Sequence, residues 1–203
     1  MTGGFILLAA LFFVLRFGHF ARWASPYAMP LPVLFLALCT LGYHRAPDWI
    51  FAALMLSSLG DTAGSTGNFL WQIAFFASAH VCYTVYFVRD FRFRKRAMPL
   101  FFAELAAVAV LFHIIVPKTD AMQRPFVILY IIVITVMAAA AICRDERRYV
   151  PYVVAALVFM ASDSVIAWNR FVERIPNAAA YIMSTYYAAQ LAFAVTSLGK
   201  QTE

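Results

Sequence analysis

The sequence predicts an all-α integral membrane protein, a single domain built as a bundle of eight transmembrane helices. Hydrophobic residues fill 64% of its 203 positions and charged residues only 13%, whereas about a quarter of an ordinary soluble domain is charged. The apolar residues gather into eight runs, and the links between them are short and carry the basic residues. No stretch is polar enough to form a separate soluble domain.

The first four runs cover residues 4–17, 29–43, 49–64 and 69–88. No Lys or Arg precedes Arg16, so we expect the first run to be a retained helix and not a cleaved signal peptide. The second run opens with two prolines, which the first turn of a helix accepts. The link between the third and fourth runs is so short that these two helices are expected to form an antiparallel hairpin.

The last four runs cover residues 98–116, 125–142, 150–168 and 178–198. The most basic stretch of the chain, RDFRFRKR, precedes the first of these and is expected to be a cytoplasmic loop. Several of the eight runs are near the short end of the about 17 to 25 residues that span a bilayer.

The formal net charge of +6 arises from residues in these links, which indicates contact with anionic lipid headgroups and excludes nucleic acid as the partner. Eight helices place both termini on one side of the membrane. Ten Lys and Arg residues fall on that side and six on the other, so we predict that both termini are cytoplasmic, in a bacterial inner membrane. The three cysteines have no CxxC spacing and are expected to be reduced core residues.

Two aspartates, Asp61 and Asp163, lie within apolar runs. An Asp at the centre of a spanning helix costs at least ~2.5 kcal/mol, so it normally faces a polar cavity or a partner. Each follows the start of its helix by about a dozen residues, which at ~1.5 Å per residue gives both a similar depth. Two adjacent carboxylates in a low dielectric cannot both ionise easily, which leaves an acid beside a base. From the residues alone, catalysis, transport or ion binding, and a structural role all stay open.

Other polar side chains recur at helical spacings. His80 and Tyr83 are three residues apart, and Tyr186, Tyr187 and Gln190 are spaced by three and four, so each set shares a helix face. These residues equally suit an interfacial aromatic belt or polar contacts between helices.

Arg170 follows Asp163 by about two helical turns and is expected to pair with it, to meet a phosphate, or to anchor the helix in the headgroups. Ser162 and Ser164 flank Asp163 without the GxSxG turn of a serine hydrolase. The four histidines are dispersed, so a three-histidine zinc hydrolase is not expected, and no metal or other cofactor is predicted.

The sequence resembles the YhhN family, which includes the TMEM86-like lysoplasmalogenases. The matching motifs, in the family's order and spacing, are SLGD at 58–61, H-x-x-Y at 80–83, P-x-x-x-x-Y at 125–130, SDS at 162–164 followed by Arg170-Phe171, and TYYAAQ at 185–190. One departure is that the family usually shows Lys-Pro where this chain has Met29-Pro30, which leaves the lipid headgroup open.

The resemblance implies an eight-helix membrane hydrolase that cleaves the vinyl ether bond of lysoplasmalogens, giving a fatty aldehyde and glycerophosphoethanolamine or glycerophosphocholine. It implies that Asp61 and Asp163 are catalytic and that the partners are a lysophospholipid substrate and membrane lipid. The predicted substrate-binding residues are His80, Tyr83, Tyr130, Ser162, Ser164, Arg170, Tyr186, Tyr187 and Gln190. A small ion-coupled transporter and a non-catalytic lipid-binding protein are the alternatives. The sequence does not determine the chain length of the lipid or the oligomeric state.

Overall fold

The computed structural model describes residues 1–18, 22–42, 47–144 and 149–199. The α-helices of this part are α1 Thr2–Phe17, α2 Ser25–Ala28, α3 Leu31–Leu41, α4 Asp48–Ser65, α5 Phe69–Val88, α6 Met98–Ile115, α7 Arg124–Ile142, α8 Tyr149–Phe171 and α9 Ala178–Leu198. Because α2 and α3 belong to one continuous stretch, Arg22–Leu41, the described chain has eight helical stretches. The predicted all-helical fold is confirmed.

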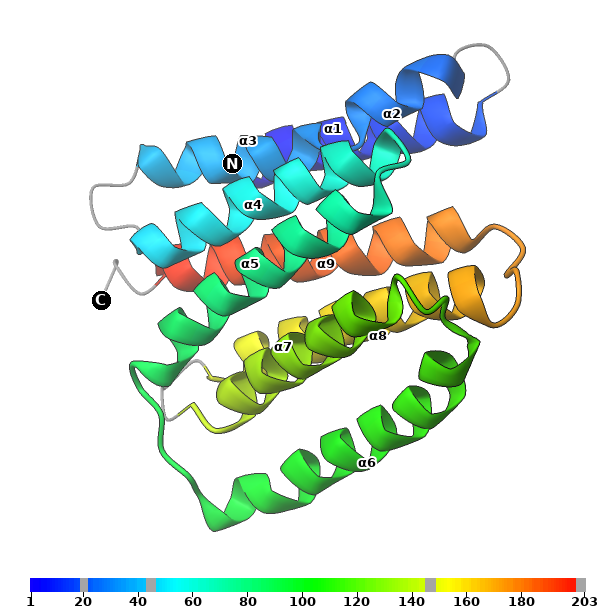
Figure 1. Cartoon of the computed structure of the whole chain (residues 1–203). Helices are drawn as coiled ribbons and strands as arrows, with labels where there is room; N and C mark the ends of the chain where they lie inside the picture. The colour runs from blue at the N-terminus through cyan, green and yellow to red at the C-terminus, as the bar shows by residue number, and fades with distance from the viewer. Residues whose placement is uncertain (19–21, 43–46, 145–148, 200–203) are drawn as a thin grey trace.

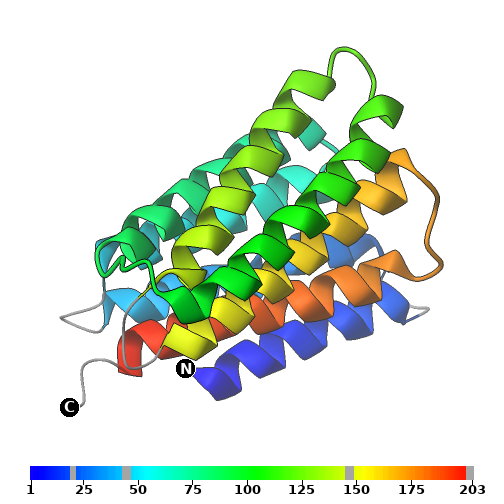
Figure 2. The ribbon, with the colours of Figure 1, turned by 90° about the horizontal axis from the view of Figure 1, so that it is seen from below.

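The long helices run side by side and alternate in direction (Figures 1 and 2). The N-terminal end of α1 and the C-terminal end of α9 lie at one end of the bundle, which we call the terminal end. The α5–α6 link also lies there, whereas the α4–α5, α6–α7 and α8–α9 turns lie at the opposite end. Arg45, Arg147, Arg148 and Lys200, which enter the charge comparison, lie outside the described residues.

Five stretches of the described chain are long and apolar enough to cross a membrane: Arg22–Leu41, Phe69–Val88, Lys95–Lys118, Arg124–Ile142 and Val150–Phe171. Helix α1 is apolar but shorter. Helices α4 and α9, which carry several polar residues of the interior, are not among these stretches. The protein is therefore an integral membrane protein, with five of the eight helical stretches meeting the length and composition of a span.

Helix α4 packs closely on α5 because two glycines face it. A Cβ atom at Gly60 would lie 3.0 Å from the Phe76 ring, and one at Gly64 would lie 2.5 Å from the Gln72 amide nitrogen. Small residues four apart allow helix backbones to approach closely in membranes. This approach holds Asp61, which follows Gly60, against the interior of the bundle.

Helix α6 lies at the edge of the bundle, opposite α1 and α3 (Figure 1). Its fully buried residues are Glu104 and Ile115, and most of its remaining surface is exposed. It contacts α7 and α8, and these three helices together with α5 surround the apolar cavity described below.

Arg144 follows the end of α7, and its side chain is buried. Its side chain is 1% exposed and donates hydrogen bonds to the Tyr86 carbonyl oxygen at 2.7 Å and to Asp90 Oδ2 at 2.6 Å. Its guanidinium lies 4.5 Å from the centre of the Tyr86 ring. The terminal carbonyls of α5 need donors, and a long side chain with five N–H groups can supply them from the end of α7.

Candidate active site

Asp163 is held by side chains from two other helices. Tyr130, on α7, donates a hydrogen bond to Asp163 Oδ2 on α8. His80, on α5, places Nε2 at 2.9 Å from the Tyr130 hydroxyl and 3.5 Å from Asp163 Oδ2. His80 is fully buried, and the Asp163 side chain keeps 10% exposure. The three residues form a polar network that orients the carboxylate and leaves it accessible.

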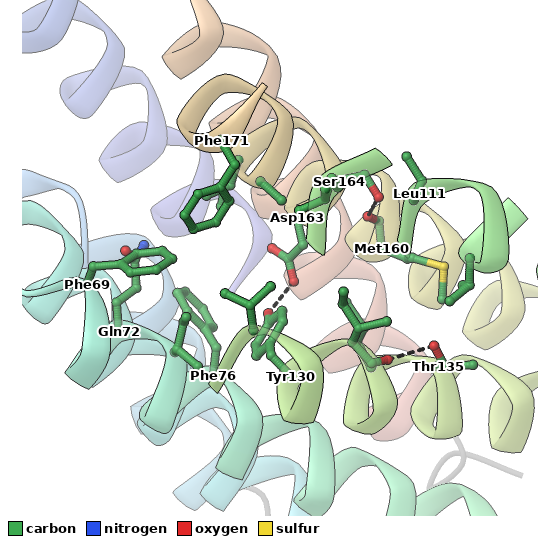
Figure 3. Close-up of a pocket in the computed structure, with 18 residues that line it drawn as sticks. Phe69, Gln72, Phe76, Leu111, Tyr130, Thr135, Met160, Asp163, Ser164 and Phe171 are labelled. Carbon is green, nitrogen blue, oxygen red and sulfur yellow. Dashed lines mark hydrogen bonds between the residues drawn. The ribbon is translucent and has the colours of Figure 1, made fainter. Parts of the chain in front are cut away.

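Asp163 faces an apolar cavity of about 90 Å³ between α5, α6, α7 and α8. Figure 3 shows Asp163 and Tyr130 pointing toward each other at its wall. Among the described residues that line it, Asp163 is the one carboxylate, and most of the others are aliphatic or aromatic. Such a lining suits an apolar group, and a group that enters the cavity would lie beside the carboxylate.

Asp61 lies in a second network. It is 1% exposed, and its Oδ2 accepts a hydrogen bond from the Tyr186 hydroxyl of α9 at 2.8 Å. Its Oδ1 is buried and has no hydrogen-bond partner within the described chain. An unpaired buried carboxylate oxygen is costly, so this site is either kept neutral or completed by a group that binds there.

An aromatic wall joins the two networks. The Phe159 ring centroid is 5.3 Å from that of Tyr186 and 4.8 Å from that of His80, and Phe76 packs on both Phe159 and Tyr186. Each carboxylate thus has its own tyrosine, with the wall in contact with both networks. The catalytic pairing of Asp61 with Asp163 stays a prediction.

The two phenylalanines of this wall were not predicted from the sequence. Phe76 comes four residues before His80, and Phe159 comes four residues before Asp163, so each shares a helix face with a polar residue of the network. That spacing was visible in the sequence, but apolar residues at helical spacing are so common in a membrane protein that it carries little signal.

Neither Tyr83 nor Tyr187 forms a hydrogen bond with Asp61 or Asp163. The Tyr83 hydroxyl donates to Gln190 Oε1 at 2.5 Å, which ties α5 to α9 in the core. The Tyr187 hydroxyl donates to the Met29 carbonyl oxygen at 2.7 Å. Tyr186 and Tyr187 therefore diverge, since adjacent residues on a helix are turned by about 100°.

The two serines beside Asp163 bind backbone carbonyls. Ser162 donates to the Ile182 carbonyl oxygen at 2.9 Å, which ties α8 to α9. Ser164 donates to the Met160 carbonyl oxygen at 2.8 Å within α8, although it also lines the apolar cavity. Ser162 contributes to helix packing, and Ser164 contributes to the cavity wall.

Arg170 does not pair with Asp163 in the structure. Its guanidinium carbon lies 3.7 Å from the centre of the Phe69 ring, in a cation–π contact that fixes the side chain at the end opposite the termini. Arg170 also lines a second, polar pocket of about 460 Å³ with Lys118, Asp120, Gln123, Asn169, Phe171 and Arg174. Apart from Arg170, none of these residues was predicted from the sequence to belong to a site.

A third buried carboxylate, Glu104, lies outside both networks. It is 4% exposed, and neither of its carboxylate oxygens has a hydrogen-bond partner in the part of the chain that the structure describes. No three His, Cys, Asp or Glu side chains gather closely enough to hold a metal ion among the described residues, which exclude His19 and His44.

The polar motifs of the sequence thus converge in the interior of one helical bundle, and comparison with known proteins shows which family shares them. The sequence model of the YhhN family matches residues 21–197. This chain belongs to the YhhN family. The resemblance inferred from its motifs is confirmed.

Named relatives of this YhhN protein include lysoplasmalogenase TMEM86B of Homo sapiens, which is 27% identical over 184 residues, covering 87% of this chain and 76% of the relative. Lysoplasmalogenase TMEM86A of Bos taurus is 27% identical over 194 residues, covering 87% and 79% of the two chains. Lysoplasmalogenase TMEM86B of Rattus norvegicus is 25% identical over 198 residues, covering 96% and 82%. No solved structure matches this YhhN chain.

Proposed function

We propose that this protein is a lysoplasmalogenase that hydrolyses the vinyl ether bond of lysoplasmenyl-ethanolamine or lysoplasmenyl-choline. The products are a fatty aldehyde and the corresponding glycerophospho-alcohol. The observation that carries the proposal is the Asp163 carboxylate, oriented by Tyr130 and His80 at the wall of an apolar cavity inside the membrane bundle. The names of its distant relatives support the same reaction.

The chemistry needs a proton donor and then a base. A neutral aspartic acid protonates the β carbon of the vinyl ether, which gives an oxocarbenium ion. The carboxylate left behind stabilises this cation and takes a proton from the water that attacks it. The hemiacetal that forms then collapses to the aldehyde and the alcohol.

We assign the contact with substrate to Asp163 because it lines the cavity and Asp61 does not. Tyr130 and His80 hold its Oδ2, which fixes the direction in which the other oxygen points. Asp61 completes the dyad from the far side of the aromatic wall. The protonation of Asp61 is coupled to that of Asp163 across the wall, since an apolar interior screens charges weakly.

The test is aldehyde release from lysoplasmenyl-ethanolamine by the purified full-length protein in detergent. We expect Asp163→Asn to lower the rate by about 10²- to 10⁴-fold, the usual contribution of a general acid or base, and Asp61→Asn to lower it clearly as well. Glu104→Gln is the matched control, because it neutralises a buried carboxylate outside both networks and should keep the wild-type rate.

A chelator control and a flux measurement in vesicles complete the test. Hydrolysis that persists in a chelator would support a mechanism without metal. Asp61→Asn and Asp163→Asn proteins that elute as the wild type on gel filtration and retain full hydrolysis would end the dyad hypothesis. Proton- or sodium-dependent flux in vesicles, with no aldehyde, would identify a transporter instead.

The proposed location is a bacterial inner membrane, with both termini in the cytoplasm. The terminal end of the bundle carries the basic residues between Arg89 and Arg96, which supports this orientation. A reporter that is active only in the cytoplasm, fused to the C-terminus, should be active. Activity of a periplasmic reporter at that position would reverse the orientation.

A further inference from the structure

The polar pocket at the end opposite the termini is lined by charges of both signs. Lys118, Arg170 and Arg174 supply three cations, and Asp120 supplies one anion. None of the described residues forms a hydrogen bond or an ion pair with the side chain of Lys118, Arg174 or Asp120. Three cations around one hollow repel one another unless an anion lies between them. The pocket is thus suited to a ligand that carries a phosphate and, beside it, a positive group.

A buried acceptor in the same pocket also has no partner. Gln123 Oε1 is inaccessible to solvent and accepts no hydrogen bond within the described chain. The neighbouring Asn169 has its Oδ1 occupied, because it accepts a hydrogen bond from the Ile175 backbone nitrogen at 2.8 Å. Because the Gln123 side chain lines the pocket, a turn of its amide would bring this oxygen to the hydroxyl group of a ligand there.

The polar pocket adjoins the apolar cavity. Phe171 lines both, so a molecule with a polar head and an apolar chain can occupy the two together. Arg170 follows Asp163 by seven residues of α8, which corresponds to about 10.5 Å at a rise of about 1.5 Å per residue. In a lysoplasmalogen about seven bonds separate the phosphorus from the β carbon of the vinyl ether, roughly 9 Å when the bonds are extended. The rise between the two backbone positions is thus close to the length of this part of the lipid.

We propose that the polar pocket binds the zwitterionic headgroup of a single-chain phospholipid. Lys118, Arg170 and Arg174 hold the phosphate, Asp120 pairs with the ammonium group, and Gln123 Oε1 accepts a hydrogen bond from the free glycerol hydroxyl. This inference rests on the proposed function, and it adds how the substrate is placed: the headgroup at the end opposite the termini, the chain past Phe171, and the vinyl ether at Asp163.

Binding of a non-cleavable lipid tests the pocket without turnover. The ligand is a 1-O-alkyl lysophosphatidylethanolamine, whose saturated ether has no vinyl carbon to protonate, and the comparison ligand is a 1-O-alkylglycerol with the same chain and no phosphate. We expect the full-length wild-type protein in detergent to prefer the phospholipid. Lys118→Ala and Arg174→Ala should each weaken phospholipid binding about tenfold, the scale of one charge-assisted hydrogen bond, and leave alkylglycerol binding unchanged.

Two variants sharpen the assignment. Asp120→Asn should weaken binding of the ethanolamine lipid and spare a lysophosphatidic acid, which has no ammonium group. Arg22→Ala is the matched control, since Arg22 is an exposed cation in the turn just before α2 and outside the pocket. It should bind both lipids as the wild type does.

The inference is overturned if Lys118→Ala and Arg174→Ala bind the phospholipid as tightly as the wild type. It is also overturned if free glycerophosphoethanolamine binds as tightly as the lipid, because the pocket would then be a site for soluble anions. The two proposals fail separately. If Lys118→Ala and Arg174→Ala selectively lose phospholipid binding but the wild type releases no aldehyde, the headgroup pocket is supported and the hydrolase proposal fails. If the wild type releases aldehyde but both variants bind the phospholipid unchanged, the hydrolase proposal is supported and the headgroup pocket fails.

Discussion

Replacing Tyr130 by phenylalanine removes one oxygen atom from the centre of the Asp163 network. The hydroxyl donates to Asp163 Oδ2 and lies 2.9 Å from His80 Nε2, so Tyr130→Phe takes a partner from both groups at once. A hydrogen bond to a charged group contributes about 1.5–3 kcal/mol. If the carboxylate needs this bond to stabilise the transition state, kcat/KM falls by about 10- to 150-fold, since each 1.36 kcal/mol is tenfold.

The assay is aldehyde release from lysoplasmenyl-ethanolamine, followed by a coupled dehydrogenase in detergent micelles. Tyr86→Phe is the matched control, because it also removes a buried hydroxyl, one that lies 2.9 Å from the Tyr152 hydroxyl and outside both aspartate networks. It should lower the thermal midpoint without changing kcat/KM. A Tyr130→Phe protein with a wild-type elution profile and an unchanged kcat/KM would refute the reasoning that the network orients Asp163 for catalysis.

Three further predictions concern stability, measured as the midpoint of thermal unfolding in detergent. Gly60→Val should lower the midpoint, because overpacking against Phe76 costs about 1–3 kcal/mol of stability, whereas a side chain at Gly3 has open space and Gly3→Val should not lower it. Equal midpoints for the two variants would contradict the close packing of α4 on α5. Arg144→Met should cost about 2–4 kcal/mol, because carbonyl oxygens at the end of α5 lose their donor; a wild-type midpoint would show that water replaces the guanidinium. Glu104→Gln should hold or raise the midpoint, since it removes an unpaired buried charge, and a clear drop would reveal a partner for Glu104.

The sequence contains strong signals for the fold and for the polar residues of the interior. Apolar run length predicts helices, and the cost of an ionisable group in a membrane singles out Asp61 and Asp163. His80 was expected to share a face with Tyr83, and both are buried in α5. Their partners differ, because His80 faces Tyr130 on α7 and Tyr83 faces Gln190 on α9.

The polar pocket is only weakly indicated by the sequence. Arg170 was expected near a phosphate or near Asp163, and the structure places its guanidinium on the Phe69 ring beside Lys118 and Arg174. Lys118 lies in the α6–α7 turn and Arg174 in the α8–α9 turn, more than fifty residues apart in the chain. Short polar links are usual at the ends of membrane helices, so their composition alone does not indicate which links meet.

The sequence by itself determined that this protein is a bundle of membrane helices of the YhhN family with two aspartates in its apolar segments, because period, length and hydropathy act within one segment at a time. Only the tertiary structure decided that Asp61 bonds to Tyr186 and Asp163 to Tyr130, with Phe159 in contact with both networks. Spacing along a helix fixes the face and the height of a side chain. Its partner on another helix depends on the rotation and the distance of the two helices. Many weak contacts across the whole bundle determine both.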